Sequence, residues 1–189
     1  MNNEGTNISQ VTPMPEGHIL ALIQRVLDGD SQAVAELYSL YYQKVYTFSY
    51  YRLGGNTLMA EDITEDTFIR AFGSIRTFKW KGGSFTSWLI TIARNLIVDT
   101  LRRPEALPLE DFWLDTASDP DLIFDELSSH RDVHHALDKL TIEQKDVIIL
   151  RFFDDLTLEE TSDAIGKSVT SVKRLQARAL AAMQIALRK

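Results

Sequence analysis

Basic side chains gather on one face of a predicted helix near the C-terminal end of the sequence. Residues 168–189 contain five Lys or Arg residues and no Asp or Glu. At the normal helical pitch, one face of this helix carries Thr170, Lys173, Arg174, Ala177 and Arg178. Cations and hydroxyls can contact phosphates and base edges of duplex DNA, and an alanine can offer only a thymine-methyl contact. The face is therefore suited to recognition of an anionic polymer.

Two short helices and a turn are predicted to present this face. Thr157 and Glu160 have the spacing of a capping box that starts the first helix, and Gly166 supplies the turn. Ser168 is placed to cap the second helix, whose other side carries an apolar stripe made of Val169, Val172, Leu175, Ala179 and Met183. The pattern is typical of a helix-turn-helix, which lays its second helix in the major groove. Two packed surface helices with a solvated charged face would look the same, so the rest of the chain must decide.

A second basic segment runs from Arg76 to Arg103, with six Lys or Arg residues and one acid. Aromatic and lysine residues alternate over 78–81 and precede two glycines. A long helix capped by Ser84 or Thr86 is predicted to follow, and its polar positions are Arg94, Asn95, Asp99, Arg102 and Arg103. Aromatics beside cations on a loop offer the stacking and phosphate contacts that single-stranded bases need. Alternatively, Phe78 and Trp80 close the end of the helical core, and we expect this of one of the two.

An acidic side is predicted on the helix over residues 60–72. It carries Glu61, Asp62, Glu65 and Asp66, while Ile63, Phe68, Ile69 and Phe72 give an apolar side. Carboxylates three and four residues apart can bind metal in helical bundles with help from histidine. No histidine is near, and no second carboxylate-rich helix is evident in the first hundred residues. A solvated face or a docking surface for a basic partner is favoured over a metal site.

Composition excludes several classes of protein. A hydrophobic content of 44% with only nine Gly and five Pro favours a globular, helix-rich chain. No apolar run approaches bilayer length and no signal peptide is evident, so we expect a cytoplasmic protein without membrane insertion. The chain has no cysteine, no Gly-rich phosphate loop and no nucleophile elbow, so we expect no catalytic residues, no cofactor and no metal. His134 and His135 are adjacent, point about 100° apart on a helix, and are expected at the surface.

The net charge of −7 is unevenly distributed. Residues 1–103 are neutral, residues 131–189 carry ten basic and nine acidic side chains, and residues 104–130 carry eight acids and no cation. The excess acidity therefore does not argue against local DNA-binding surfaces. We predict an all-α fold of two small helical domains, over 18–103 and 131–189, joined by an acidic linker over 104–130. Residues 1–17 form a predicted flexible tail.

Three segments in this order resemble the extracytoplasmic-function (ECF) group of sigma-70-family sigma factors, which have only σ2 and σ4 domains. They are AEDITEDTFIRAF at 60–72, FTSWLITIARNLIVDTLRR at 85–103 and LTLEETSDAIGKSVTSVKRLQARAL at 156–180. Each is only moderately specific, but the order and spacing of all three are highly specific. The resemblance implies an RNA polymerase sigma factor that binds core polymerase and directs promoter-specific initiation, with no activity as an enzyme.

The resemblance also implies site residues. The helix at 60–72 would dock on the β′ coiled coil of core polymerase, through Asp62, Glu65, Asp66, Phe68, Ile69 and Arg70. Core polymerase also contacts such proteins through its β flap. The melted −10 element, with one base flipped out, would be recognised by Phe78, Lys79, Trp80, Lys81, Ser84, Arg94, Asn95, Asp99, Arg102 and Arg103. The duplex −35 element would be recognised by Ser168, Thr170, Ser171, Lys173, Arg174, Ala177 and Arg178.

Two further expectations concern the linker and the partners. In the family, the connector between σ2 and σ4 runs toward the active-site cleft and the RNA exit channel of polymerase. There the eight carboxylates of residues 104–130 would mimic the charge of nucleic acid; a linker that is only solvated is the alternative. Members of the group are commonly held by an anti-sigma factor between or around σ2 and σ4. The alternative function is a stand-alone helix-turn-helix regulator with an N-terminal sensing or dimerisation domain, which would bind a duplex operator without polymerase, usually as a dimer.

Overall fold

The computed structural model describes residues 16–79, 84–102 and 132–188, and the described residues form helices and no strand. The predicted all-α fold is therefore confirmed. In the first part of the chain lie α1 (Glu16–Leu27), α2 (Ser31–Arg52), α3 (Thr57–Ser74), the 3-10 turn η1 (Ile75–Thr77) and α4 (Phe85–Arg102). A short helix over 132–138 precedes α6 (Ile142–Phe152), α7 (Leu158–Ile165) and α8 (Val169–Leu187).

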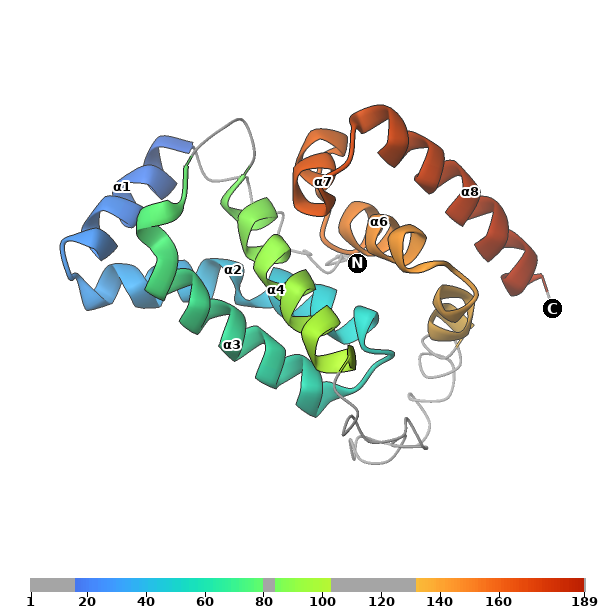
Figure 1. Cartoon of the computed structure of the whole chain (residues 1–189), viewed down its shortest axis with the longest axis horizontal. Helices are drawn as coiled ribbons and strands as arrows, with labels where there is room; N and C mark the ends of the chain where they lie inside the picture. The colour runs from blue at the N-terminus through green and yellow to red at the C-terminus, as the bar shows by residue number, and fades with distance from the viewer. Residues whose placement is uncertain (1–15, 80–83, 103–131, 189) are drawn as a thin grey trace, which may run out of the picture.

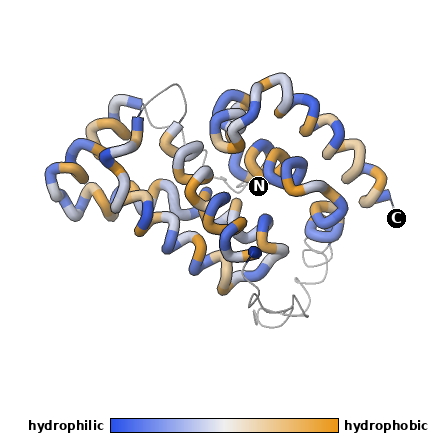
Figure 2. Tube along the Cα trace, in the orientation of Figure 1, coloured by the Kyte–Doolittle hydropathy of each residue, from blue (hydrophilic) through white to orange (hydrophobic). Residues whose placement is uncertain are grey.

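Helix α2 is the centre of the N-terminal group of helices, because α1, α3 and α4 all pack against it (Figure 1). Asp30 caps its N-terminus, because the Asp30 carboxylate accepts hydrogen bonds from the backbone N–H groups of Gln32 and Ala33. Hydrophobic and hydrophilic residues alternate along the helices (Figure 2), and the buried hydrophobic ones build one core. Its fully buried side chains include Leu22, Leu37, Phe48, Leu89 and Ile97.

Side-chain caps set the start of α6, α7 and α8. Thr141 and Thr157 each accept a hydrogen bond from the backbone of the residue three positions on, whose side chain bonds back to the threonine N–H, so both capping boxes are present. Gly166 has a φ of 67°, a left-handed conformation that favours glycine, and it ends α7. Ser168 then caps α8 through the backbone N–H of Ser171. The box at Thr157, the turn at Gly166 and the cap at Ser168 confirm the predicted helix-turn-helix.

The two groups of helices pack directly against each other. Helix α2 lies against α6 and α4 lies against α7 (Figure 1), and one apolar cluster continues from the N-terminal helices into Val147, Ile149 and Leu150.

The predicted surface position of His134 is wrong: its ring is stacked 5.1 Å from that of Tyr51, and the residue is 3% exposed. The short helix over 132–138 covers the end of α2, and a periodicity argument cannot reveal this contact. Its neighbour His135 is exposed as expected.

Candidate nucleic-acid and polymerase interfaces

The basic face of α8 is exposed to solvent along its length. Thr170, Lys173, Arg174, Ala177 and Arg178 are all exposed, whereas Val172 and Ala179 on the opposite side are fully buried. The first residues of the face sit over the helix N-terminus, where Ser168 and Ser171 exchange a hydroxyl hydrogen bond of 2.9 Å. Cations, hydroxyls and a helix N-terminus are thus available together to a phosphate backbone.

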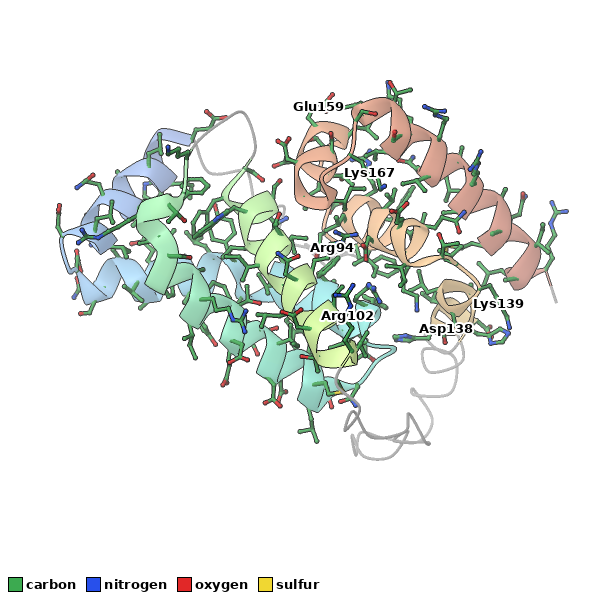
Figure 3. The ribbon with its side chains drawn as sticks, viewed as in Figure 1. Arg94, Arg102, Asp138, Lys139, Glu159 and Lys167 are labelled. Carbon is green, nitrogen blue, oxygen red and sulfur yellow. The ribbon has the colours of Figure 1, made fainter. Side chains whose placement is uncertain are left out.

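A surface depression beside this face includes a residue that sequence reasoning missed. It is lined by Glu143, Lys167, Ser171, Arg174, Leu175 and Arg178. The Lys167 ammonium forms a 2.8 Å ion pair with Glu143 of α6 and lies at the start of α8 (Figure 3). Its position directly before the N-cap of a helix without acids was the available sequence signal. Gln176, by contrast, faces inward and accepts a hydrogen bond from Arg151.

Helix α3 presents an acidic face with an apolar centre. Asp62, Glu65, Asp66 and Arg70 are exposed, and Ile69 exposes 69% of its surface. Leu58 is 61% exposed and falls on the same face, four residues before Asp62 and eleven before Ile69. Acids around exposed aliphatic side chains suit a protein interface with a basic partner.

Phe68 does not belong to that surface, and its assignment as a docking residue is corrected. It is 2% exposed and its ring centroid lies 4.7 Å from that of Tyr38 on α2. Adjacent helical positions point about 100° apart, so Ile69 can be exposed while Phe68 is in the core. The neighbouring helix α2 decides which of the two is buried.

The predicted −10 residues of α4 divide between two faces. Asn95, Asp99 and Arg102 are exposed on one side of the helix. Arg94 lies on another side and points toward α6 (Figure 3), where its Nε donates a 2.8 Å hydrogen bond to Asp146. Trp80, Lys81 and Arg103 lie outside the described residues.

Phe78 closes the end of the core, the structural role expected of one of the two loop aromatics. Its ring centroid lies 5.3 Å from that of Phe85 and 5.2 Å from that of Trp88. Ser84 accepts a hydrogen bond from the backbone N–H of Ser87 and caps α4, so the second candidate cap, Thr86, is not used. Lys79 is exposed. A depression here is lined by Phe78, Lys79, Ser84, Ser87, Trp88, Thr91 and Asp163, the last from α7.

Polar contacts join the two groups of helices along one edge of α4. The hydroxyls of Ser87 and Thr91 donate to the carbonyls of Glu160 and Ala164 at 2.9 and 3.3 Å. Burial disfavours the charged form of Glu160, but hydrogen bonds from the Thr157 backbone and from the Ser84 and Thr157 side chains hold the pKa of Glu160 below its usual range. The edge of α4 that bears Ser84 and Arg94 is thus covered by the C-terminal helices.

A buried carboxyl group lies at the same boundary without a hydrogen-bond partner for one of its oxygens. Asp154 is 3% exposed, its Oδ2 is unpaired, and its backbone carbonyl accepts a 2.8 Å hydrogen bond from Lys44 of α2. Burial raises the pKa of Asp154 well above its usual range, an effect opposed by the Lys44 charge and reinforced by that of Asp155. A buried ionised carboxylate is a cost to the folded state.

We therefore expect Asp154→Asn to stabilise the protein at pH 8 by on the order of 1 kcal/mol. Because the folded-state pKa is raised, the unfolded chain releases its proton first as pH increases, and the wild type loses stability between the unfolded and folded pKa values. The advantage of the variant should shrink as pH falls toward 4. Urea unfolding at both pH values measures this, with Asp66→Asn, at an exposed acid on α3, as the control. If the stability gained by Asp154→Asn were larger at pH 4 than at pH 8, a raised pKa of Asp154 would be contradicted.

Known families match both groups of helices. Residues 37–106 match Sigma-70 region 2 and residues 136–184 match Sigma-70 region 4. The ECF RNA polymerase sigma factor BldN of Streptomyces coelicolor is 36% identical over 170 residues, which cover 86% of this chain and 63% of BldN. The ECF RNA polymerase sigma factor SigX of Bacillus subtilis is 35% identical over 153 residues, covering 76% of this chain and 78% of SigX. The chain belongs to the ECF group of sigma-70-family RNA polymerase sigma factors.

Solved structures share the fold. CnrH, solved in complex with the cytosolic domain of CnrY, matches with a TM-score of 0.68 at 21% identity, over 89% of this chain and 96% of that one. RpoE, solved with the anti-sigma factor NepR from Bartonella quintana, matches with a TM-score of 0.65 at 22% identity, over 82% of this chain and 96% of that one.

Within the described ranges, no helix is long and apolar enough to cross a bilayer, and no three potential ligand side chains converge to hold a metal ion.

Proposed function

We propose that this chain directs core RNA polymerase to promoters whose −35 element it reads as duplex and whose −10 element it reads as a melted strand. The observation that carries the proposal is the exposed basic face of α8, presented by a capped helix-turn-helix. The chain has no catalytic role of its own and acts in the cytoplasm, where promoter DNA and polymerase are found.

We assign one binding role to each of the predicted domains. Residues 18–103 would bind polymerase and the −10 element, residues 131–189 would bind the −35 element, and residues 104–130 would be the linker. The acidic and aliphatic face of α3, without Phe68, is the proposed surface for the β′ coiled coil. An anti-sigma factor is a further proposed partner, because CnrH and RpoE share this fold and RpoE was solved bound to one.

The decisive experiment is run-off transcription with core polymerase on a library of promoters. A sigma factor should produce defined start sites and bind promoter DNA tightly only with polymerase. A stand-alone regulator, the alternative, should instead bind a duplex operator by itself, usually as a dimer. Tight operator binding without polymerase, and no initiation with it, would refute the proposal.

Substitutions on α8 test the −35 assignment. Lys173→Ala and Arg178→Ala should each weaken −35-dependent initiation by roughly 1–3 kcal/mol where the contact is to a base edge. Arg188→Ala is the matched control, because Arg188 is also exposed but lies beyond the last residue of α8. Promoter titration on templates with intact and scrambled −35 elements measures the effect. If both variants use promoters as the wild type does, the phasing of the recognition helix is wrong.

A further inference from the structure

One buried carboxylate in the C-terminal group of helices is shared by two arginines from the N-terminal group. The Oδ1 of Asp146 accepts a 2.8 Å hydrogen bond from the Nε of Arg52, and its Oδ2 accepts one of 2.8 Å from the Nε of Arg94. The side chain of Asp146 is fully buried, and those of Arg52 and Arg94 are 6% and 26% exposed. The cluster therefore holds two positive charges against one negative charge.

The two arginines would remain neighbours if the C-terminal helices moved away. Arg52 ends α2 and Arg94 lies in the middle of α4, and these helices pack against each other inside the N-terminal core. Without Asp146, two guanidinium groups would face each other with no anion between them, which is electrostatically unfavourable. The pair is a preformed receptor for a single anion with two acceptor oxygens. A carboxylate and a phosphodiester both meet that description.

The surroundings of the pair favour nucleic acid over a protein carboxylate. Along α4 the edge that leads to Arg94 carries Ser84, Ser87 and Thr91, so it offers hydroxyls and a guanidinium, the groups that usually contact DNA phosphates. The exposed residues Asn95, Asp99 and Arg102 lie on the adjacent face of the same helix. A DNA strand bound to that face of α4 would place its phosphate backbone along the edge that leads to Arg94.

We infer that Arg52 and Arg94 bind one phosphodiester group of the promoter strand, and that Asp146 fills this site in the closed chain. The inference rests on the proposed −10 function and adds Arg52 to it. Ser84 and Arg94 become available to DNA only when α6 and α7 leave α4, so the closed arrangement withholds the site. Opening replaces the Asp146 carboxylate by a phosphate.

The first test measures the salt dependence of promoter binding by the complete chain bound to core polymerase. Arg52→Gln and Arg94→Gln should each weaken binding to a −10 fork-junction DNA about five- to tenfold. Each should also reduce the slope of log K against log [salt] by about 0.7–0.9, the value for one phosphate. The double variant should lose no more slope than either single one, since both arginines hold the same phosphate. Arg25→Gln, at an exposed ion pair on α1, is the control and should change neither quantity.

The second test uses the free chain. Asp146→Asn should bind a single-stranded −10 oligonucleotide about tenfold more tightly than the wild type, because the competing anion is gone, and Arg52→Gln in the same chain should remove the gain. Asp138→Asn, an exposed acid paired with Lys145, is the control. If Asp146→Asn fails to fold by circular dichroism, the arginine variants in the holoenzyme decide alone.

The outcomes separate this inference from the proposed function. Unchanged salt slopes in both arginine variants, with normal initiation by the wild type, would overturn the phosphate site and leave the sigma function standing. A loss of affinity for core polymerase without a change in salt slope would also overturn it, because the pair would then bind a polymerase carboxylate. Failure of the wild type to initiate at any promoter would reject the function itself, and the site with it.

Discussion

Charge reversal at Asp62 and Glu65 is expected to abolish binding of the chain to core RNA polymerase while leaving the fold intact. Both side chains are exposed on α3, beside the exposed aliphatic side chain of Ile69. Lysines at these positions would replace attraction to a basic partner with repulsion, and like-charge contacts across an interface cost several kcal/mol. Exposed substitutions usually change stability by less than about 0.5 kcal/mol, so the helix should survive.

The measurement is the affinity of Asp62→Lys/Glu65→Lys for core polymerase, together with its circular dichroism and urea midpoint. A matched control reverses two exposed acids away from α3, Asp28→Lys/Asp132→Lys, and should bind like the wild type. Ile69→Ala tests the apolar centre of the same face and should weaken binding less than the double reversal. Wild-type affinity in the double variant, with an unchanged fold, would show that this face of α3 does not dock on polymerase.

Local features of this fold were predictable from sequence because they depend on residues a few positions apart. The capping box at Thr157, the left-handed turn at Gly166 and the exposed face of α8 all follow from hydrogen-bond chemistry and helical periodicity. The same periodicity placed Val172 in the core. Each of these predictions needs no knowledge of which helices are neighbours.

The residues that sequence reasoning misplaced are those whose environment is set by another helix. Phe68 is buried because Tyr38 lies beside it, and His134 is buried because the 132–138 segment covers the end of α2. Arg94 stays a predicted DNA contact, but nothing near it in sequence indicates that Asp146 of the C-terminal helices reaches it in this structure. The available signal was Asp146 itself, an acid that directly precedes the apolar run Val147–Leu150. An acid in such a run requires a buried cation as its partner.

Phe85→Ala is expected to be the most destabilising single substitution proposed for this chain. Phe85 is 1% exposed at the start of α4, and its ring centroid lies 5.0 Å from that of Tyr41 and 5.5 Å from that of Trp88. Truncation leaves a cavity between α2 and α4 and removes the aromatic support of Phe78, so we expect a loss of about 3–5 kcal/mol in the free energy of unfolding. Urea denaturation of the full chain measures it.

The substitution should also affect promoter opening before it unfolds the protein. Phe78 and Ser84 flank the segment proposed to capture the melted strand, and both depend on the position at which α4 begins. At a temperature where Phe85→Ala remains folded, polymerase binding through α3 should persist while open-complex formation falls, as permanganate reactivity of the −10 thymines would show. Phe152→Ala is the matched control, because that ring is 51% exposed and its loss should cost less than about 1 kcal/mol. Equal destabilisation by the two variants would mean that Phe85 does not anchor the start of α4.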